Sequence, residues 1–408
     1  MIPNEANVVV IGGGVLGTSA AFHLSEAGHD KVVLLDRGPI ASGTTPFAAG
    51  QTGYLTSDTS GFEFNLYCIE FFENFEERTG YPIDFHQNGS LRIALTQQYL
   101  PDLEARLGTA QEVGHDAVKM ITPERAKELV PGLELPEVAG ILLIPRDGFV
   151  EPKSVAVAYA AGARDRGVAI HTRTEVTGLD VANGKVKGVR TSQGDIRTEW
   201  VVLAAGAWTR QFAQQLGLDV KAVPVRHQAF VTAPMAEVSE SQPIVRFTEP
   251  QIYIRPYDGG LLVGGYGYRP LSFDMNEFQH DFEIPALEAD SIYFDQLLEA
   301  TSPFFPMLHQ AVIIQERRGL PTITPDGKFL VSDFDQMQGL ILASGCMVGG
   351  VNHSPGVGRV VADFVSGNTA WPPAADLKAD RFNVEFDNEI RLRSRCEELY
   401  ANHYHRSF

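Results

Sequence analysis

Three glycines near the start of the chain have the spacing of a phosphate-binding turn. Gly12, Gly14 and Gly17 directly follow a β-branched, apolar run at residues 8–11. The first glycine of such a turn permits a tight bend, the second lets the backbone approach a pyrophosphate, and the third lets a helix pack on the strand. Asp36 ends the next β-branched run, where an acid can accept hydrogen bonds from ribose hydroxyls. The stretch predicts a dinucleotide site rather than an ordinary glycine-rich turn.

Further glycine and hydroxyl residues follow apolar runs elsewhere. Residues 41–50 combine small residues with a serine and two threonines, which suits a loop passing close to a flat or anionic group. The apolar runs at 200–208 and 339–345 each lead into a glycine, as a parallel strand does where it faces a ligand. Residues 349–358 are rich in glycine and lead into a helix. These stretches are candidates for walls of the same site.

The elements that must position these residues change in character near Pro224. Before it, β-branched runs alternate with amphipathic helices, as in an α/β domain with a parallel sheet. From Pro224 to Gln315 short strands dominate, which favours an antiparallel sheet. Helices are expected at residues 18–27, 62–78, 97–113, 122–129, 153–166, 277–280, 284–300 and 359–366 and from residue 209, and strands at 8–11, 31–35, 89–95, 141–144, 168–171, 174–180, 228–232, 252–255 and 261–264.

Composition excludes several classes of partner. The net charge of −18 argues against nucleic acid or an anionic membrane as the main partner. The three cysteines, Cys68, Cys346 and Cys396, are widely spaced, show no metal-ligand spacing and suit a reducing compartment. No signal segment and no apolar run of about 18–20 residues is visible, so a cytoplasmic location without a membrane span is expected.

Four stretches resemble the FAD-dependent amine-oxidising family of D-amino acid oxidase, glycine oxidase and sarcosine oxidase. Residues 42–50 are similar to its S-G-T-T-x-H-A-A-G, and residues 147–152 to its D-G-x-x-D/E-P. Residues 204–208 match its A-x-G-A-W turn, and residues 253–265 match Y-x-R-P followed by G-L-L-V-G-G. The resemblance covers nearly the whole chain. It is strongest to the flavin domain of dimethylglycine and sarcosine dehydrogenases.

The resemblance implies an interleaved α/β architecture. A Rossmann-type FAD-binding domain would comprise residues 1–80, 145–222 and 320–370. An α+β substrate domain with an antiparallel sheet would comprise residues 81–144 and 223–319, and a C-terminal helical tail would span 371–408. The residues expected to contact FAD are Gly12, Gly14, Val15, Leu16, Gly17, Asp36, Arg37, Ser42, Gly43, Thr44, Thr45, Ala49, Gly50, Val176, Ala205, Gly206, Trp208, Gly345, Gly349, Gly350, Val351, Asn352 and His353.

Two departures from the family pattern bear on how FAD is held and on what the chain can do. Phe47 stands where the dehydrogenases carry the histidine that bonds covalently to flavin, and phenylalanine has no nucleophile. The cysteine used by monomeric sarcosine oxidases is also absent from residues 317–321. We therefore expect non-covalent FAD. The sequence also stops at Phe408, so the folate-binding half of the dehydrogenases is not expected in this chain.

The implied reaction is oxidation of a secondary or tertiary amine, such as sarcosine, dimethylglycine or a cyclic imino acid. The flavin accepts a hydride equivalent at N5 and the resulting imine hydrolyses. The helix expected to begin at residues 356–359 can stabilise the negative charge of reduced flavin.

Four side chains are candidates for contact with substrate. Tyr253 corresponds to a pocket-lining tyrosine of sarcosine oxidases, or is a core tyrosine. Arg255 can bind a substrate carboxylate bidentately, or form an ion pair within the sheet. His227 and His353 are candidate polar contacts near the flavin, with structural histidines as the alternative. Asn352 falls nearest the carboxylate-binding lysine of sarcosine oxidase, so Arg317 and Arg318 are alternative anchors.

The electron acceptor and the catalytic role leave several hypotheses open. No lysine lies in residues 261–266, where sarcosine oxidase uses one to react with oxygen, which slightly favours a dehydrogenase with an electron-transfer protein over an oxidase. A homo-oligomer is possible. The alternatives are the FAD subunit of a hetero-oligomeric opine or hydroxyproline dehydrogenase, and a non-catalytic flavin-binding protein. An NAD-binding protein would not explain residues 42–50 or 204–208.

Overall fold

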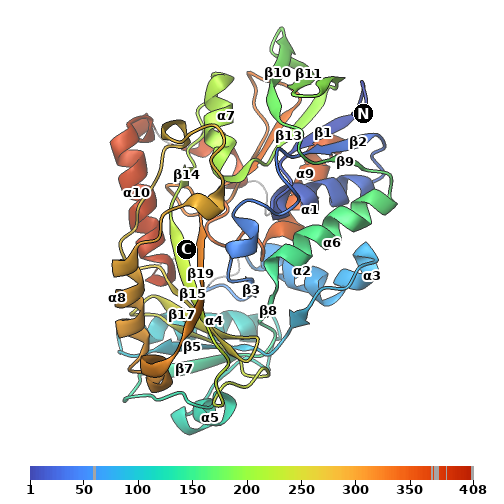
Figure 1. Cartoon of the computed structure of the whole chain (residues 1–408). Helices are drawn as coiled ribbons and strands as arrows, with labels where there is room; N and C mark the ends of the chain where they lie inside the picture. Colours follow the sequence, from blue (N-terminus) through green and yellow to red (C-terminus); the bar gives the residue numbers. More distant parts are fainter. Residues whose placement is uncertain (58–60, 369–370, 372–375, 383, 406–408) are drawn as a thin grey trace.

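The computed structural model describes residues 1–57, 61–368, 371, 376–382 and 384–405. Two large sheets organise the chain, and helices pack against both (Figure 1). The α-helices are α1 (Val15–Glu26), α2 (Phe62–Glu73), α3 (Phe75–Thr79), α4 (Leu100–Glu112), α5 (Pro123–Leu129), α6 (Pro152–Asp165), α7 (Thr209–Gln215), α8 (Ser291–Thr301), α9 (Ser354–Ser366) and α10 (Glu389–Ala401).

A six-stranded sheet carries the glycine-rich turn. Its order is β21-β22-β13-β1-β2-β9, and all pairs are parallel except β21 with β22. Helices α1, α6 and α9 pack on one face of this sheet, and the small β10-β11-β12 sheet packs on the other. Strand β1 is therefore buried on both sides, which explains its continuous run of apolar residues. The strands are β1 (Val8–Ile11), β2 (Val32–Leu35), β9 (Ala169–His171), β10 (Val176–Ala182), β11 (Lys185–Thr191), β12 (Gly194–Arg197), β13 (Trp200–Leu203), β21 (Leu330–Ser332) and β22 (Leu340–Ser344).

An eight-stranded sheet forms the other half, in the order β19-β15-β18-β17-β16-β5-β7-β6. Six of its seven neighbouring pairs are antiparallel, including every pair between strands of residues 224–319, whereas β16 runs parallel to β5. The strands are β5 (Ser90–Ala94), β6 (Lys119–Met120), β7 (Gly140–Ile144), β15 (His227–Thr232), β16 (Ile244–Phe247), β17 (Ile252–Tyr257), β18 (Gly260–Gly265) and β19 (Ile313–Gly319).

Two small sheets join the halves. In one, β8 (Gly148–Val150) lies between β3 (Gln51–Thr52) and β4 (Phe85–His86); in the other, β14 (Val223–Pro224) pairs with β20 (Thr322–Ile323). The strands of each large sheet fall inside the residue ranges expected for the two domains, whose boundaries stay a prediction. The mixed α/β architecture predicted from the sequence is confirmed.

Several predicted helices have different bounds, and the helix expected at 277–280 is a 3-10 turn at Met275–Glu277. The helix expected at 62–78 divides at Asn74 into α2 and α3. The helix expected at 284–300 is a 3-10 turn, η4 (Ile284–Ala286), followed by α8, which starts where the Asp290 carboxylate accepts a hydrogen bond from the Tyr293 backbone N–H at 3.3 Å. Helix α9 begins at Ser354, one turn earlier than expected, because Pro355 suits a first helical turn.

The C-terminal helix α10 is part of the core. Leu392, Cys396 and Tyr400 are almost fully buried against β14, β15 and β20, so this part of the expected helical tail packs into the fold. Phe408, where the tail prediction ended, lies outside the described residues. Among the described helices, none has the length and apolar character needed to cross a membrane.

Candidate functional site

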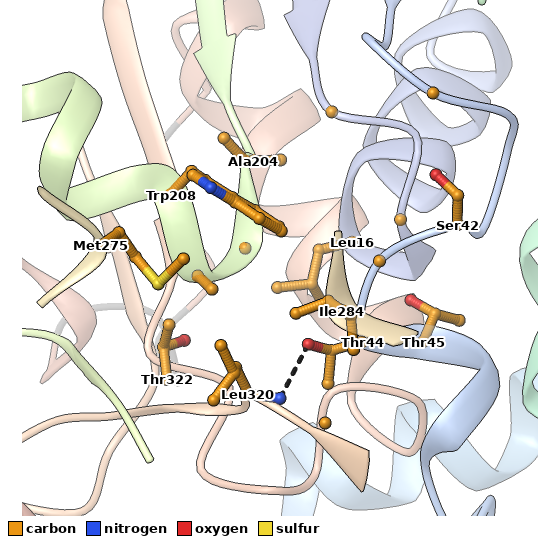
Figure 2. Close-up of a pocket in the computed structure, with 18 of the residues that line it drawn as sticks. Leu16, Ser42, Thr44, Thr45, Ala204, Trp208, Met275, Ile284, Leu320 and Thr322 are labelled. Atoms are coloured by element: carbon orange, nitrogen blue, oxygen red, sulfur yellow. Dashed lines mark hydrogen bonds between the residues drawn. The ribbon is translucent and has the colours of Figure 1, made fainter. Parts of the chain in front are cut away.

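A cavity of about 630 Å³ lies where the parallel strands end. Gly12 follows β1, Asp36 follows β2, Ala204 follows β13 and Cys346 follows β22, and all four line this cavity. The carboxyl ends of β1 and its neighbours form the ligand site typical of open α/β sheets. Figure 2 shows the wall formed by Leu16 and Thr44 on one side and Trp208 on the other.

The glycines of the β1–α1 turn have separate tasks. Gly12 has φ +114°, and a Cβ there would lie 2.3 Å from the Ala204 carbonyl oxygen. A Cβ on Gly17 would lie 1.9 Å from the Gly12 carbonyl oxygen, so Gly17 serves the packing of α1 and does not line the cavity. Gly14 does line it, has an ordinary φ of −73°, and places no side chain of its own between the cavity and the start of α1. The start of α1 is therefore accessible to an anionic group.

Asp36 shapes the same end of the cavity. Its carboxylate accepts hydrogen bonds from the backbone N–H groups of Gly13 and, at 2.6 Å, Gly38. Burial raises the pKa of Asp36, and the two N–H groups act in the opposite direction. The carboxylate thus fixes the turn while its residue faces the cavity, which is consistent with a place beside a ribose.

Hydroxyl and guanidinium groups pin the loop after β2. The Thr45 hydroxyl accepts from the Val15 N–H at 3.1 Å, and the Thr44 hydroxyl accepts from the Leu320 N–H at 3.1 Å (Figure 2). Arg255 donates to the Ala49 carbonyl at 2.7 Å, and Arg317 donates to the Ala48 carbonyl at 3.2 Å. Both guanidinium groups therefore reach from the eight-stranded sheet to the backbone of a loop that lines the cavity.

The glycine-rich stretch before α9 forms another wall through Val348, Gly350 and Val351. Val348 has φ +60°, a left-handed conformation that is costly for a β-branched residue and is typically found at functional sites. Asn352 does not line the cavity; its amide exchanges hydrogen bonds of 3.0 and 2.9 Å with the backbone of Gly53.

His227 brings the eight-stranded sheet to the cavity. Its Nε2 lies 2.7 Å from the Tyr253 hydroxyl and its Nδ1 lies 2.7 Å from the Tyr400 hydroxyl. Tyr266 stacks on the imidazole with a centroid separation of 5.3 Å and also lines the cavity. Both ring nitrogens of His227 are thus engaged by tyrosines, and Tyr266 presents a second aromatic surface.

The predicted contacts divide into two groups. The structure brings His227 and seventeen of the expected FAD contacts to the cavity wall: Gly12, Gly14, Val15, Leu16, Asp36, Arg37, Ser42, Gly43, Thr44, Thr45, Ala49, Val176, Ala205, Gly206, Trp208, Gly350 and Val351. The wall does not include Gly17, Gly50, Gly345, Gly349, Asn352, His353, Tyr253 or Arg255.

Tyr253 is fully buried because Gly264 on the neighbouring strand leaves room for its ring; a Cβ there would lie 2.2 Å from the Tyr253 hydroxyl. Arg255 is 2% exposed and, besides Ala49, donates to the carbonyl of Pro256, so these hydrogen bonds go to backbone carbonyls and not to a carboxylate. Tyr266, Cys346 and seven residues between Met275 and Ile284 line the wall but were not expected there from the sequence. Tyr266 directly follows the G-L-L-V-G-G stretch, which could have identified it.

Two buried histidines, His23 and His227, and the half-buried His353 make the stability of the fold sensitive to acid. Burial lowers the pKa of His23, His227 and His353 from 6.5 to about 4. The unfolded chain therefore binds protons between about pH 6.5 and pH 4 that the native chain does not, so stability is lost as the pH falls through this window.

When the pH is lowered from about 7 to about 5, we expect the free energy of unfolding to fall by about 2 kcal/mol for each of these histidines. Urea unfolding at the two pH values measures the loss. His23→Gln should reduce the difference, whereas His309→Gln, at an exposed position, should leave it unchanged. If the free energy of unfolding depended equally on pH in both variants, the contribution assigned to His23 would be contradicted.

Comparisons with known proteins agree on one family. The family described as FAD dependent oxidoreductase matches residues 7–364. Dimethylglycine dehydrogenase of Rattus norvegicus is 32% identical over 370 residues, covering 89% of this chain and 43% of that protein. The pyruvate dehydrogenase phosphatase regulatory subunit of Mus musculus is 29% identical over 405 residues, covering 98% of this chain and 45% of that protein. The chain thus spans less than half the length of these relatives.

A solved structure extends the comparison to the fold. L-proline dehydrogenase from P. horikoshii superposes with a TM-score of 0.81 at 26% identity, covering 91% of this chain and 96% of that one. The size of the cavity, the glycine cradle, the start of α1 at the cavity wall and the half-buried acid after β2 fit an FAD molecule.

Proposed function

Because this chain belongs to the family of FAD-dependent oxidoreductases, we propose that it oxidises a secondary or tertiary amine of amino-acid type. One observation carries the proposal: a single cavity runs from the turn at Gly12 to His227 and Tyr266 of the other sheet. The first region suits a dinucleotide and the second offers an aromatic surface for a small organic molecule. The names of relatives such as dimethylglycine dehydrogenase support an N-methyl amino acid.

FAD supplies the oxidising chemistry by accepting a hydride equivalent from the carbon next to nitrogen. The protein's part is to hold and surround the reactants. Burial keeps His227 neutral above its pKa of about 4, so it does not repel a cationic amine near neutral pH. Tyr253 and Tyr400 position the imidazole through its two nitrogens, and Tyr266 covers one face of the ring.

FAD is held without a covalent bond at position 47 in this proposal. Phe47 lines the cavity and offers no nucleophile. Cys346 lines the same cavity and carries a thiol, the side-chain group to be considered for a covalent bond to flavin. Burial raises the pKa of Cys346, which keeps the thiol protonated and weakly nucleophilic. Acid precipitation of the yellow holoprotein should release all FAD into the supernatant; flavin in the pellet would identify a covalent link.

A panel of amines tests the substrate class. The holoprotein is mixed with sarcosine, dimethylglycine, proline, glycine and an opine, with an artificial electron acceptor. We expect turnover with at least one secondary or tertiary amine and weaker turnover with primary glycine. The same reaction under air, without the artificial acceptor, distinguishes an oxidase from the dehydrogenase that the absence of lysine in residues 261–266 favours.

A regulatory protein is the second candidate. The match to a pyruvate dehydrogenase phosphatase regulatory subunit over 98% of this chain favours it. Such a protein would bind FAD yet show no turnover with any amine. An FAD subunit of a hetero-oligomeric opine or hydroxyproline dehydrogenase would instead purify with a second polypeptide.

A further inference from the structure

A segment of the substrate half covers the nucleotide end of the cavity. This segment, here called the strap, comprises residues 273–287 between β18 and α8 and contains the short turns η3 (Met275–Glu277) and η4. Figure 2 shows Met275 and Ile284 on the same cavity as Leu16 and Trp208, which belong to the nucleotide half. The strap residues that line the cavity are Met275, Phe278, Gln279, His280, Asp281, Glu283 and Ile284.

The strap is a thin wall. A second hollow of about 540 Å³ is lined by strap residues alone, and Phe278, Gln279, Asp281 and Glu283 line both this hollow and the main cavity. Gln279, Asp281 and Glu283 are also exposed, so side chains of the strap stand between the nucleotide end of the cavity and solvent. Displacing these side chains would open the cavity without unfolding either large sheet.

Arg37 fastens the strap to the nucleotide half. It follows Asp36 directly, and its guanidinium group donates hydrogen bonds to the carbonyls of His280 at 3.3 Å and Phe282 at 2.7 Å. The same group lies 4.1 Å from the centroid of the Trp208 ring, a cation–π contact. One side chain thus joins the carboxyl end of β2, the turn after β13 and two carbonyls of the strap.

Two further contacts support the closed position. His280 Nε2 lies 2.8 Å from a carboxylate oxygen of Glu175, and the Gln211 amide donates to the Met275 carbonyl at 3.1 Å. Phe282 packs 6.4 Å from the Trp208 ring but does not itself line the cavity. Because the His280 side chain is 81% exposed, its contact with Glu175 is individually weak, which suits a wall that opens and closes.

We infer that the strap is a closure that retains FAD, with Arg37 as its fastening. A chain without a covalent flavin link depends on such a closure, because dissociation then requires the strap to lift from Arg37 and Trp208. Uptake of FAD by apoprotein requires the same movement. This inference depends on FAD binding and not on which amine is oxidised.

The test measures release of FAD from the holoprotein. FAD fluorescence rises when the cofactor leaves the protein, so dilution of holoprotein gives the dissociation rate directly. Arg37→Ala and Phe282→Ala should each accelerate release about tenfold, the effect expected from loss of one charge-assisted or aromatic anchor. Phe282→Ala is decisive, because Phe282 does not line the cavity and can act only through the strap.

Matched variants separate closure from direct contact with FAD. Arg197→Ala removes an arginine whose side chain is 74% exposed and should leave the rate unchanged. Limited proteolysis of holoprotein should show faster cleavage within residues 273–287 for both strap variants. If Phe282→Ala does not yield holoprotein, Phe282→Leu, which keeps an apolar side chain but removes the ring that faces Trp208, replaces it. Unchanged release and proteolysis in the strap variant, with faster release in Arg37→Ala, would overturn the closure.

Discussion

Gly14→Leu is expected to give a folded protein that contains no FAD. Residue 14 has φ −73°, which any residue adopts, and a Cβ there would meet only the Thr45 hydroxyl, at 3.4 Å. The backbone therefore tolerates the change. The larger side chain would occupy the cavity wall at the start of α1, where a pyrophosphate must approach the backbone. We expect affinity for FAD to fall at least about a thousandfold, the loss of about 4 kcal/mol of binding energy.

Gly12→Ala is the matched comparison. Its Cβ would lie 2.3 Å from the Ala204 carbonyl oxygen, and its φ of +114° is unfavourable for alanine, so this variant should lose stability as well as FAD. Absorbance near 450 nm reports the cofactor, and circular dichroism with thermal unfolding reports the fold. A yellow Gly14→Leu protein with normal FAD affinity would contradict the assignment of this turn.

Asp147→Ala is expected to destabilise the whole fold. The carboxylate is 2% exposed, accepts from the Ser90 hydroxyl at 2.6 Å and pairs with the Arg246 guanidinium at 2.8 Å. Arg246 is also buried, and it extends the network to the side chain of Gln51 at 2.9 Å. Removing one partner leaves a buried charge uncompensated, which costs about 3–5 kcal/mol. Asp147, the aspartate of the D-G-F-V-E-P stretch, thus takes part in a network that links β3, β5 and β16.

Urea unfolding measures this loss. Asp180→Ala removes a partner of Arg190 from an exposed ion pair and should change the free energy of unfolding by less than about 1 kcal/mol. The double variant Asp147→Ala, Arg246→Met should recover part of the loss, since it removes the stranded charge. A loss in Asp147→Ala no larger than that in Asp180→Ala would contradict the structural role.

Local sequence patterns predicted the nucleotide half well. Gly12, Gly14 and Asp36 act within forty residues of one another, so the strand, turn, helix and strand that position them can be inferred from spacing alone. The predicted start of α9 was one turn too late, because its first residues, Ser354 and Pro355, belong to a glycine-rich stretch without a repeating pattern of apolar residues.

Long-range contacts decided the rest of the site. Tyr253 was expected at the cavity, but the ring turns into the core beneath Gly264, and only the pairing of β17 with β18 determines this. Tyr400 meets His227 across 173 residues of sequence, and nothing in the local sequence of α10 indicates that contact. The strap carries no repeating pattern, and its role follows only from the carbonyls that Arg37 reaches.

One measurement tests the proposed amine oxidation most directly. Holoprotein is mixed anaerobically with an excess of each amine of the panel, and the absorbance of oxidised FAD near 450 nm is followed in a single turnover. We predict that at least one secondary or tertiary amine bleaches this band completely and yields one equivalent of aldehyde or keto acid per FAD. Persistence of the band with every amine, in protein that retains FAD, would contradict the enzymatic function and favour the regulatory one.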